Sequence, residues 1–422
     1  MTASVPIPAG ARHGRWLVLA GILLAAFNLR TAVTSLTPLL DMLRADLGFG
    51  PGVAGVLGML PTAAFAFFGV STARIVHRIG LEKTTALAMA LAMAGVLVRG
   101  WAPGVAALGA ASLLALAGMG IGNVVLPPLV KRWFPDRVGT LSAAYITLLQ
   151  VGTMVPAFVA VPLAQAYGWR VSLAGWALPA ALALAPWLLL SLRQARAHAH
   201  GGDIATTRPP AGASAWRSPL AWALAAMFGM TSLATYSMFT WLPRWFVDAG
   251  LSEVQAGNLL GAYSAIALLP TFLVPMLAPR MRRPDVFVLL AVVCYATGFA
   301  GMLLAPLSLP WLWAAALGMA GATFPLGLVL INLRTRTAAG SAALSSFAQG
   351  VGYSVACLGP LLFGLLHDWS GGWGWSVAFI ALCVGVMAWG GWTASRQRAL
   401  EDEWSPRVAQ RDRAQRTPSA PR

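Results

Sequence analysis

Arg30 lies inside the first long apolar run of the chain, and this cation limits how the chain can fold more than any other residue. The run predicts a helix from about Trp16 to Leu40. At ~1.5 Å per residue, Arg30 lies ~21 Å from the start of that helix, well inside a hydrocarbon core of ~30 Å. A charge at that depth is costly, so it usually faces a cavity and needs an anionic or strongly hydrogen-bond-accepting partner.

The composition predicts an all-α membrane protein with many spans. The 422 residues are 58% hydrophobic and only 10% charged, whereas soluble domains carry about 25% charged residues. The net charge of +16 is distributed in small clusters between apolar runs. That arrangement argues against a nucleic-acid partner and favours a lipid bilayer.

Apolar runs bounded by Pro, Gly and charged residues predict twelve membrane spans. The expected limits are 16–40, 52–73, 84–102, 105–128, 139–165, 171–192, 219–243, 254–278, 286–306, 311–332, 341–366 and 374–395. Most of the 29 Lys and Arg residues fall on one side of these spans, and Arg44, Arg99, Arg170 and Arg244 lie at or near the other. The positive-inside rule then places both termini in the cytoplasm of a bacterial inner-membrane protein.

The predicted spans divide into two six-helix bundles. We expect an N-terminal tail at 1–15, bundles at 16–192 and 219–395, a flexible linker at 193–218 and a disordered tail at 396–422. The halves repeat weakly, because Gly152 and Pro162 in the fifth span match Gly350 and Pro360 in the eleventh at one offset. Such pseudosymmetry favours a transporter with its site between the halves. We interpret the partner of Arg30 as the transported substrate.

Polar residues within the spans are the candidates for a substrate site. On the first span, Arg30, Thr34 and Thr37 share one helical face, and Asn28 lies on an adjacent face. Arg99, near the outer end of the third span, either snorkels to the interface or makes a second anion contact or an outer gate. The other candidates are Asn123, Tyr145, Gln150, Tyr236, Gln349 and Tyr353. For all the uncharged residues the alternative is hydrogen bonding between helices. Pro127 and Pro128 loosen the backbone hydrogen bonds of the fourth span.

Several activities lack the residues they need. All 13 acidic residues and all five His residues fall in loops, span ends or tails, so no intramembrane proton relay is visible. No Walker motif, nucleophile–base set or metal cluster occurs. We therefore expect no enzymatic activity, cofactor or metal. Cys294, Cys357 and Cys383 lie in apolar stretches, and we interpret them as small, buried, hydrophobic residues.

The layout resembles the major facilitator superfamily. The segment Arg74-Ile-Val-His-Arg-Ile-Gly-Leu-Glu-Lys83 resembles the signature of that superfamily between spans two and three. His77 stands where an acidic residue is usual, whereas Arg78 and Gly80 match the pattern. The resemblance implies that Arg78 and Gly80 take part in conformational gating, and we expect the same of Pro127 and Pro128 because they loosen the backbone of their span.

Within the superfamily, the chain resembles the cyanate permease and 2-nitroimidazole transporter family. The matching segments are Asn28–Pro38, Val98-Arg99, Gly120–Asn123, Leu129–Arg132, Asp248–Ser252, Phe347–Tyr353, Gly359-Pro360 and Leu365–Asp368. This resemblance implies a carrier for small, planar, anionic or nitro-bearing solutes that works by alternating access, with Asn28, Arg30, Arg99 and Gln349 leading the site candidates. We expect a monomer, with protons as one candidate coupling ion. The alternatives are a proton-coupled multidrug exporter and a membrane sensor or assembly partner that does not transport.

Overall fold

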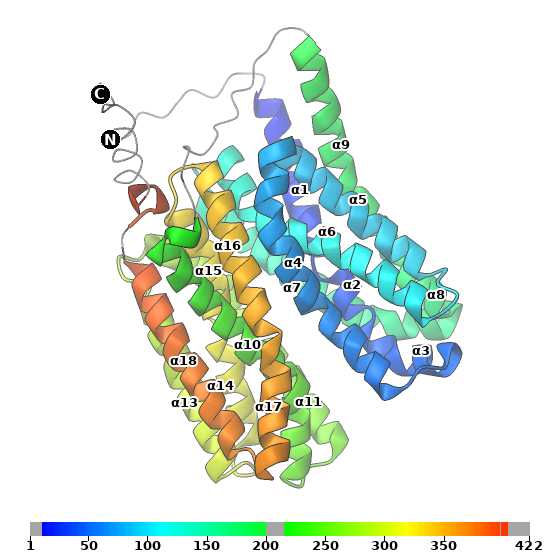
Figure 1. The fold of residues 1–422 in the computed structure, drawn as a ribbon, viewed down its shortest axis with the longest axis vertical. Coiled ribbons are helices and arrows are strands. Elements are labelled where there is room, and N and C mark those ends of the chain that lie inside the picture. Colours follow the sequence, from blue (N-terminus) through cyan, green and yellow to red (C-terminus); the bar gives the residue numbers. More distant parts are fainter. Residues whose placement is uncertain (1–10, 200–214, 397, 404–422) are drawn as a thin grey trace, which may run out of the picture. The chain divides into compact units, whose positions relative to one another are not determined.

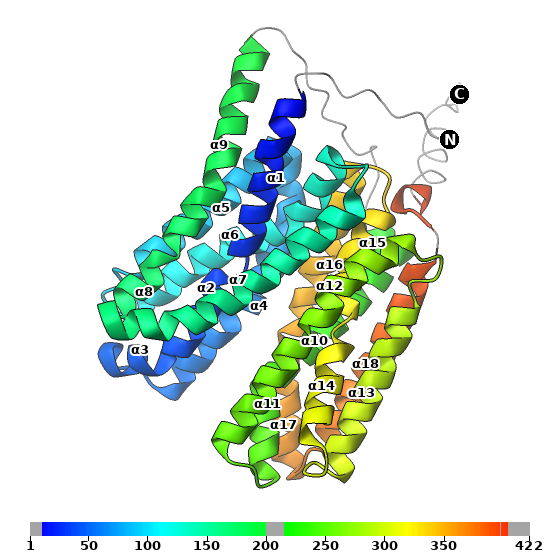
Figure 2. The ribbon, with the colours of Figure 1, turned by 180° about the vertical axis from the view of Figure 1, so that it is seen from behind.

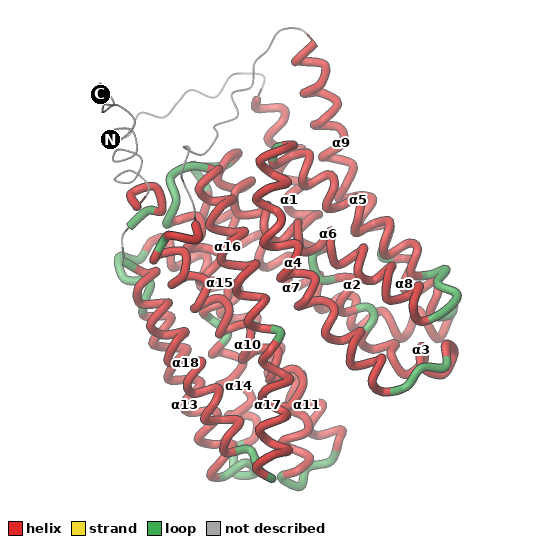
Figure 3. Tube along the Cα trace, viewed as in Figure 1, coloured by secondary structure: helices red, strands yellow, loops and turns green. Residues whose placement is uncertain are grey.

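The computed structural model describes residues 11–199, 215–396 and 398–403, and every regular element in those ranges is a helix (Figures 1 and 3). Most of the predicted N-terminal tail, linker and C-terminal tail therefore lies outside the described residues. Backbone proximity divides the chain into two compact units. The first comprises residues 1–68, 74–136 and 144–206, and the second comprises 69–73, 137–143 and 207–422.

The first unit is built mainly from the N-terminal helices, which are α1 (Ala11–Asn28), α2 (Thr31–Thr34), the 3-10 turn η1 (Thr37–Leu39), α3 (Leu40–Leu47), α4 (Pro51–Ile79), α5 (Leu81–Arg99), α6 (Val105–Trp133), α7 (Val138–Tyr167), α8 (Trp169–Gly175) and α9 (Ala177–Ala199). The second unit contains η2 (Ala215–Arg217), α10 (Pro219–Asp248), α11 (Glu253–Ile266), α12 (Leu268–Leu277), η3 (Ala278–Arg280), α13 (Val286–Leu304), α14 (Pro310–Ala320), α15 (Thr323–Leu333), α16 (Ala338–Ala356), α17 (Leu358–Ser370) and α18 (Gly374–Ser395).

All twelve predicted spans coincide with helical segments. Eleven segments in the described part of the chain are long and apolar enough to cross a membrane. The seventh span corresponds to α10, which has 30 residues and is long enough but more polar than the others. Its hydroxyl-bearing residues, which lower its hydropathy, are Thr231, Ser232, Thr235, Ser237 and Thr240.

Four spans are interrupted three residues before a proline. The breaks fall at Trp176, Ala267, Ala322 and Cys357, and the prolines are Pro179, Pro270, Pro325 and Pro360. A proline has no backbone N–H and crowds the carbonyl four residues earlier, so it disrupts the helix one turn before itself. Proline alone does not decide the outcome, because α6 continues through both Pro127 and Pro128.

The first span is also broken, and the prediction of one helix from Trp16 to Leu40 was wrong. The chain leaves the helix at Leu29 and Arg30, and again at Ser35 and Leu36. Pro38 accounts for the second interruption, since it removes the donor to the carbonyl of Thr34. No proline lies four residues after the first interruption. The break at Arg30 must therefore come from side-chain and tertiary contacts.

Close backbone contacts hold the helices of the first unit together. A Cβ on Gly118 of α6 would collide with the carbonyl of Ala88 in α5, and one on Gly152 of α7 would collide with the carbonyl of Phe27 in α1. Small residues at such crossings are typical of membrane helices, whose backbones can then approach closely. Gly152 thus places α7 directly beside the break in the first span.

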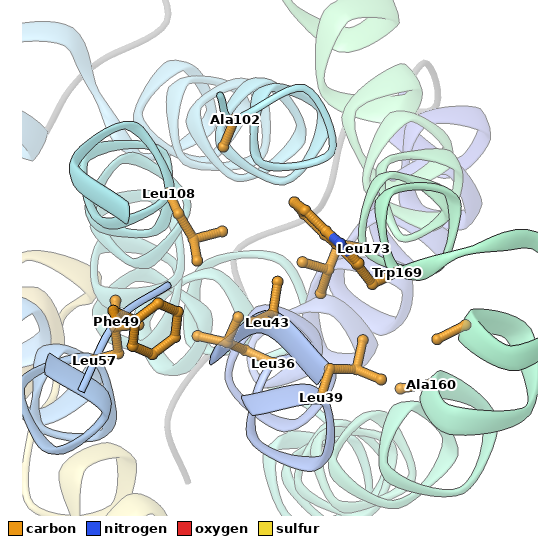
Figure 4. Close-up of a cluster of buried hydrophobic side chains, with 11 residues drawn as sticks. Leu36, Leu39, Leu43, Phe49, Leu57, Ala102, Leu108, Ala160, Trp169 and Leu173 are labelled. Atoms are coloured by element: carbon orange, nitrogen blue, oxygen red, sulfur yellow. The ribbon is translucent and has the colours of Figure 1, made fainter. Parts of the chain in front are cut away.

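An apolar cluster closes one end of the first unit. Leu36, Leu39 and Leu43 point into it from the broken first span and α3, and Leu173 meets them from α8 (Figure 4). Trp169 also packs there, and its Nε1 donates a hydrogen bond of 2.8 Å to Oδ2 of Asp46. This bond, with a second from Arg170 at 3.0 Å, holds the pKa of Asp46 below its ordinary value.

In the second unit α10 packs along α16 and α18, and α13 lies beside α14 (Figure 2). Gly229 of α10 faces Gly352 of α16, so the two backbones meet with no intervening side chain. The hydroxyls of Thr231 and Thr323 are 2.7 Å apart and join α10 to α15. Such hydrogen bonds stabilise contacts between membrane helices.

Two predicted flexible segments are partly ordered. α9 continues to Ala199, seven residues into the predicted linker, because Leu, Arg, Gln and Ala favour helix. In the predicted disordered tail, residues 398–403 pack against the second unit, and Leu400 is fully buried. Glu401 accepts hydrogen bonds from the backbone N–H groups of Arg336 and Thr337. The tail is therefore not disordered from its first residue.

Gly152→Ala should destabilise the protein, because the added methyl group collides with backbone that cannot rotate away. Overpacking of this kind costs about 1–3 kcal/mol. Gly109→Ala in α6 is the matched control, since a Cβ there meets nothing within 4 Å. Thermal unfolding of the purified protein should show a lower melting temperature for Gly152→Ala only. Equal melting temperatures for the two variants would contradict the close approach of α7 to α1.

Candidate functional site

Arg30 occupies the break in the first span and is largely buried, at 9% exposure. Its backbone dihedrals are φ −127° and ψ −10°, so it lies between α1 and α2 rather than inside either helix. The guanidinium carbon lies 4.9 Å from the ring centroid of Phe65 in α4. Phe65 is itself 1% exposed. A cation over an aromatic face is attracted to the ring quadrupole, more strongly where water is excluded.

Hydroxyl groups bind the carbonyls around the break. Thr31 Oγ1 donates to the carbonyl of Asn28 at 3.0 Å, and Thr34 Oγ1 donates to that of Arg30 at 3.1 Å. The carbonyl of Arg30 also accepts the backbone N–H groups of Val33 and Thr34, so the Thr34 hydroxyl adds a hydrogen bond there and does not replace a lost one. Thr34 was predicted to contact substrate. Its hydroxyl proton is already used by the backbone, which leaves its oxygen as an acceptor.

Arg99 is fully buried, so the expectation that it snorkels to the interface was wrong. It ends α5, and its Nη1 donates a hydrogen bond of 2.8 Å to the carbonyl of Ala32 in α2. That carbonyl has lost its usual helical donor, because the N–H of Leu36 bonds to Val33 instead. Arg99 thus holds the segment that follows Arg30.

A small cavity of about 30 Å³ adjoins Arg99. The broken first span, α4 and Ser112 of α6 also line it. Three polar groups here have no hydrogen-bond partner among the described residues: Nε and Nη2 of Arg99, and the hydroxyl of Ser112. This volume is far smaller than that of a pocket for a drug-sized ligand.

Asn28 joins two helices through its side-chain amide. Nδ2 donates to the carbonyl of Leu24 at 2.8 Å and to that of Pro179 in α9 at 3.0 Å. The side chain is fully buried. Both amide protons are therefore used within the protein, and only the amide oxygen is left for another partner.

The other predicted residues of the first unit lie on α6 and α7. Asn123 is 6% exposed and follows Gly122, where an added Cβ would meet the side chain of Leu29. Tyr145 is buried, and its hydroxyl has no hydrogen-bond partner among the described residues. Gln150 is half-buried and lies two residues before Gly152, at which α7 contacts Phe27. Asn123 and Gln150 therefore lie on α6 and α7, the helices that flank the break.

In the second unit the predicted site residues of α16, Gln349 and Tyr353, are buried. Gln349 Nε2 donates a hydrogen bond of 2.8 Å to Ser345 Oγ one turn earlier. Tyr353 packs edge-on against Phe228 of α10, with ring centroids 5.2 Å apart. Tyr236 on α10 is half-buried.

Sequence reasoning missed a second polar group in this unit. Thr235 shares hydrogen bonds with the phenol hydroxyls of Tyr263 and Tyr295, which come from α11 and α13. Both tyrosines are 3% exposed. With only six Tyr residues in the chain, a Tyr within a span was a usable signal. Phe65 was also missed, and none of the 17 Phe residues could be singled out by composition.

The predicted gating residues lie at helix ends or within α6. Gly80 joins α4 to α5 with φ +83°, a conformation that a residue with a side chain rarely adopts. Arg78, just before it, is exposed. The buried acid of this region is Glu82, which accepts a hydrogen bond of 3.0 Å from Trp133 Nε1 and lies 3.4 Å from Arg132 Nε. Glu82 thus ties the start of α5 to the end of α6.

Metal chemistry finds no support in the ordered part of the chain. Across the described ranges, no three His, Cys, Asp or Glu residues gather closely enough to hold an ion. The cations of the first unit therefore dominate the chemistry of the candidate site, which suits an anion or the acceptor atoms of a neutral solute.

Comparisons with known proteins show what the chain is similar to. A family model described as Major Facilitator Superfamily matches residues 22–357. The chain is 33% identical over 389 residues to the 2-nitroimidazole transporter of Escherichia coli (strain K12), covering 92% of this chain and 97% of that protein. It is 31% identical over 365 residues to the cyanate transport protein CynX of the same organism, covering 86% and 93%. The solved structure of the proton:xylose symporter XylE superposes with a TM-score of 0.69 at 15% identity, covering 93% of this chain and 99% of that one.

Asn28→Ala should lower stability rather than abolish ligand binding, because it removes the hydrogen bond between α1 and α9. Interhelical hydrogen bonds in membranes contribute about 0.6–2 kcal/mol. Ser191→Ala is the matched control, since its hydroxyl bonds only within α9, to Trp187. Melting temperatures and ligand titrations of both variants test the assignment. A normal melting temperature with lost binding would instead place Asn28 against the substrate.

Proposed function

The chain belongs to the major facilitator superfamily, and from that premise we propose that it carries a small anionic or nitro-bearing solute across the bacterial inner membrane by alternating access. It is a multi-pass membrane transporter and not an enzyme. Family membership alone leaves the substrate open, because one fold serves many solutes. The substrate class must therefore be argued from the residues.

The observation that carries the proposal is the position of Arg30. Its guanidinium is held over Phe65 at a break in the first membrane span, where no proline requires a break. A cation so deep in a span is costly to keep and usually serves a substrate path. Its planar group of N–H donors matches planar acceptors such as carboxylates, and two N–H groups can bond at once.

The names of the relatives agree with that chemistry. Cyanate is a small anion, and the nitro group of 2-nitroimidazole presents two acceptor oxygens in one plane. Both solutes are small and offer hydrogen-bond acceptor atoms, and a guanidinium can donate to a single acceptor atom of cyanate or to both oxygens of a nitro group.

Arg99 takes a positioning role in this proposal. Arg99 lines a small cavity, and its guanidinium donates a hydrogen bond to the carbonyl of Ala32. It therefore supports the backbone conformation of the break at which Arg30 lies. Hydrogen bonds to the solute are proposed for Asn123, Tyr145 and Gln150 of the first unit, while Tyr236, Gln349 and Tyr353 of the second unit stay candidates from the sequence.

Arg30→Gln should remove ligand binding while the protein still folds. Glutamine keeps an N–H donor but lacks the positive charge and the paired, planar N–H donors of the guanidinium. The test is thermal unfolding of purified protein with cyanate, nitrate, short carboxylates and 2-nitroimidazole. A ligand at 100 times its dissociation constant stabilises the folded state by ~2.7 kcal/mol. We expect that shift in the parent protein and not in Arg30→Gln.

Arg244→Gln is the control for charge alone, since Arg244 is exposed and pairs only with Asp248 on its own helix. It should keep the ligand shift. A shift preserved in Arg30→Gln would remove Arg30 from the site. Stabilisation by bulky apolar cations, with proton current during flux into liposomes, would favour the multidrug exporter instead.

Phe65→Leu should weaken ligand binding less than loss of Arg30 does. Leucine fills part of the space but lacks the ring quadrupole that orients the guanidinium, a contact of about 0.5–2 kcal/mol. We expect a 2- to 30-fold rise in the dissociation constant. Phe67→Leu is the matched control, because Phe67 lies on the same helix and is 68% exposed. Unchanged affinity in Phe65→Leu would show that the ring does not position Arg30.

A further inference from the structure

A second basic pocket lies within the second unit, apart from every residue assigned to the solute. Its volume is about 350 Å³. Three segments line it, namely the turn at 278–284, the end of α15 with Arg334–Arg336, and residues 398–402. Four arginines face it, Arg282, Arg334, Arg336 and Arg398, against one acid, Asp402. The pocket is therefore strongly electropositive.

The C-terminal segment forms one wall of this pocket. The N–H of Leu400 donates a hydrogen bond of 2.8 Å to the carbonyl of Arg334. Arg336 Nη2 lies 2.6 Å from Asp402 Oδ1, and Thr337 Oγ1 donates to Glu401 at 2.9 Å. These contacts hold residues 398–403 against the turn after α15, so the wall is built by specific bonds.

The four arginines divide into two pairs. Arg334 donates through Nε and Nη2 to the carbonyls of Ala394 and Ser395 at the end of α18, at 2.8 and 2.5 Å. Arg334 and Arg336 are thus engaged by the scaffold. Arg282 and Arg398 are exposed, and neither forms an ion pair within the described part of the chain. Their guanidinium groups are the ones available to a ligand.

We propose that this pocket binds a phosphate group through Arg282 and Arg398, with Arg334 and Arg336 supplying further positive charge. A phosphate presents several acceptor oxygens, which arginine donors bind in pairs. The volume accommodates a phosphate with its attached group. The pocket lies where two spans end, at Arg280 and Leu333, which is the level of lipid headgroups. The phosphate therefore comes either from an anionic lipid or from a soluble phosphate compound.

Binding there would fasten the C-terminal segment to the second unit. Arg282 belongs to the turn before α13 and Arg398 to the docked segment, so one phosphate between them links the two walls. The ligand would thereby stabilise the packing of residues 398–403. This inference does not depend on the identity of the transported solute.

The test uses the full-length protein in nanodiscs and has two arms. In the lipid arm, phosphatidylcholine discs with and without phosphatidylglycerol are compared by thermal unfolding, and retained phosphatidylglycerol is counted by native mass spectrometry. In the soluble arm, inorganic phosphate and pyrophosphate are titrated against chloride at equal ionic strength. Stabilisation in the lipid arm identifies a headgroup site, and stabilisation in the soluble arm identifies a free phosphate site.

The decisive variant is Arg282→Gln with Arg398→Gln, which leaves the contacts of Arg334, Arg336 and Glu401 intact. We expect at least a tenfold loss of affinity for the stabilising ligand. Arg280→Gln with Arg283→Gln is the control, because these exposed arginines flank Arg282 without lining the pocket. The proposal is overturned if neither arm stabilises the parent protein, or if the two double variants respond equally.

Discussion

A backbone carbonyl that loses its helical hydrogen bond inside a bilayer has no water to bind it. In this protein, polar side chains bind backbone carbonyls at the break in the first span and between helices. The first span breaks at Arg30, and the carbonyls around the break are bound by Thr31, Thr34 and Arg99. Asn28 and Trp241 donate hydrogen bonds between helices, to the carbonyls of Pro179 in α9 and Pro360 in α17. Several polar side chains that the sequence suggests as substrate contacts therefore donate hydrogen bonds to backbone carbonyls.

This constraint separates two kinds of buried arginine. Arg99 has no exposed surface and bonds to a freed carbonyl, so its charge supports the fold of the broken span. Arg30 lies at the break itself, over the ring of Phe65, and retains a small exposed surface. Sequence hydropathy treats both as cations in an apolar run. The distinction depends on where each side chain ends, and it makes Arg30 the stronger candidate for contact with the solute.

Apolar runs bounded by Pro, Gly and charged residues predicted the twelve spans, including α10, which is less apolar than the other eleven. Pro179, Pro270, Pro325 and Pro360 act on the helical turn before them, but the sequence does not distinguish them from Pro127 and Pro128, through which α6 continues. The break at Arg30 could not be predicted from the sequence, because no proline lies four residues after it and its contacts with Phe65 and Arg99 come from α4 and α5. Likewise, Glu401 docks the tail through partners that are 65 residues away in sequence.

By itself, the sequence determined the class of the protein, its spans and the presence of a cation, Arg30, inside the first span. These follow from composition and from distances along one helix, which need no knowledge of neighbouring helices. Only the tertiary structure decided which polar groups hold helices together, that Phe65 lies under Arg30, and that Arg282 and Arg398 share a pocket. Those facts depend on side chains from segments far apart in the chain, whose meeting is set by packing and hydrogen bonding rather than by local pattern.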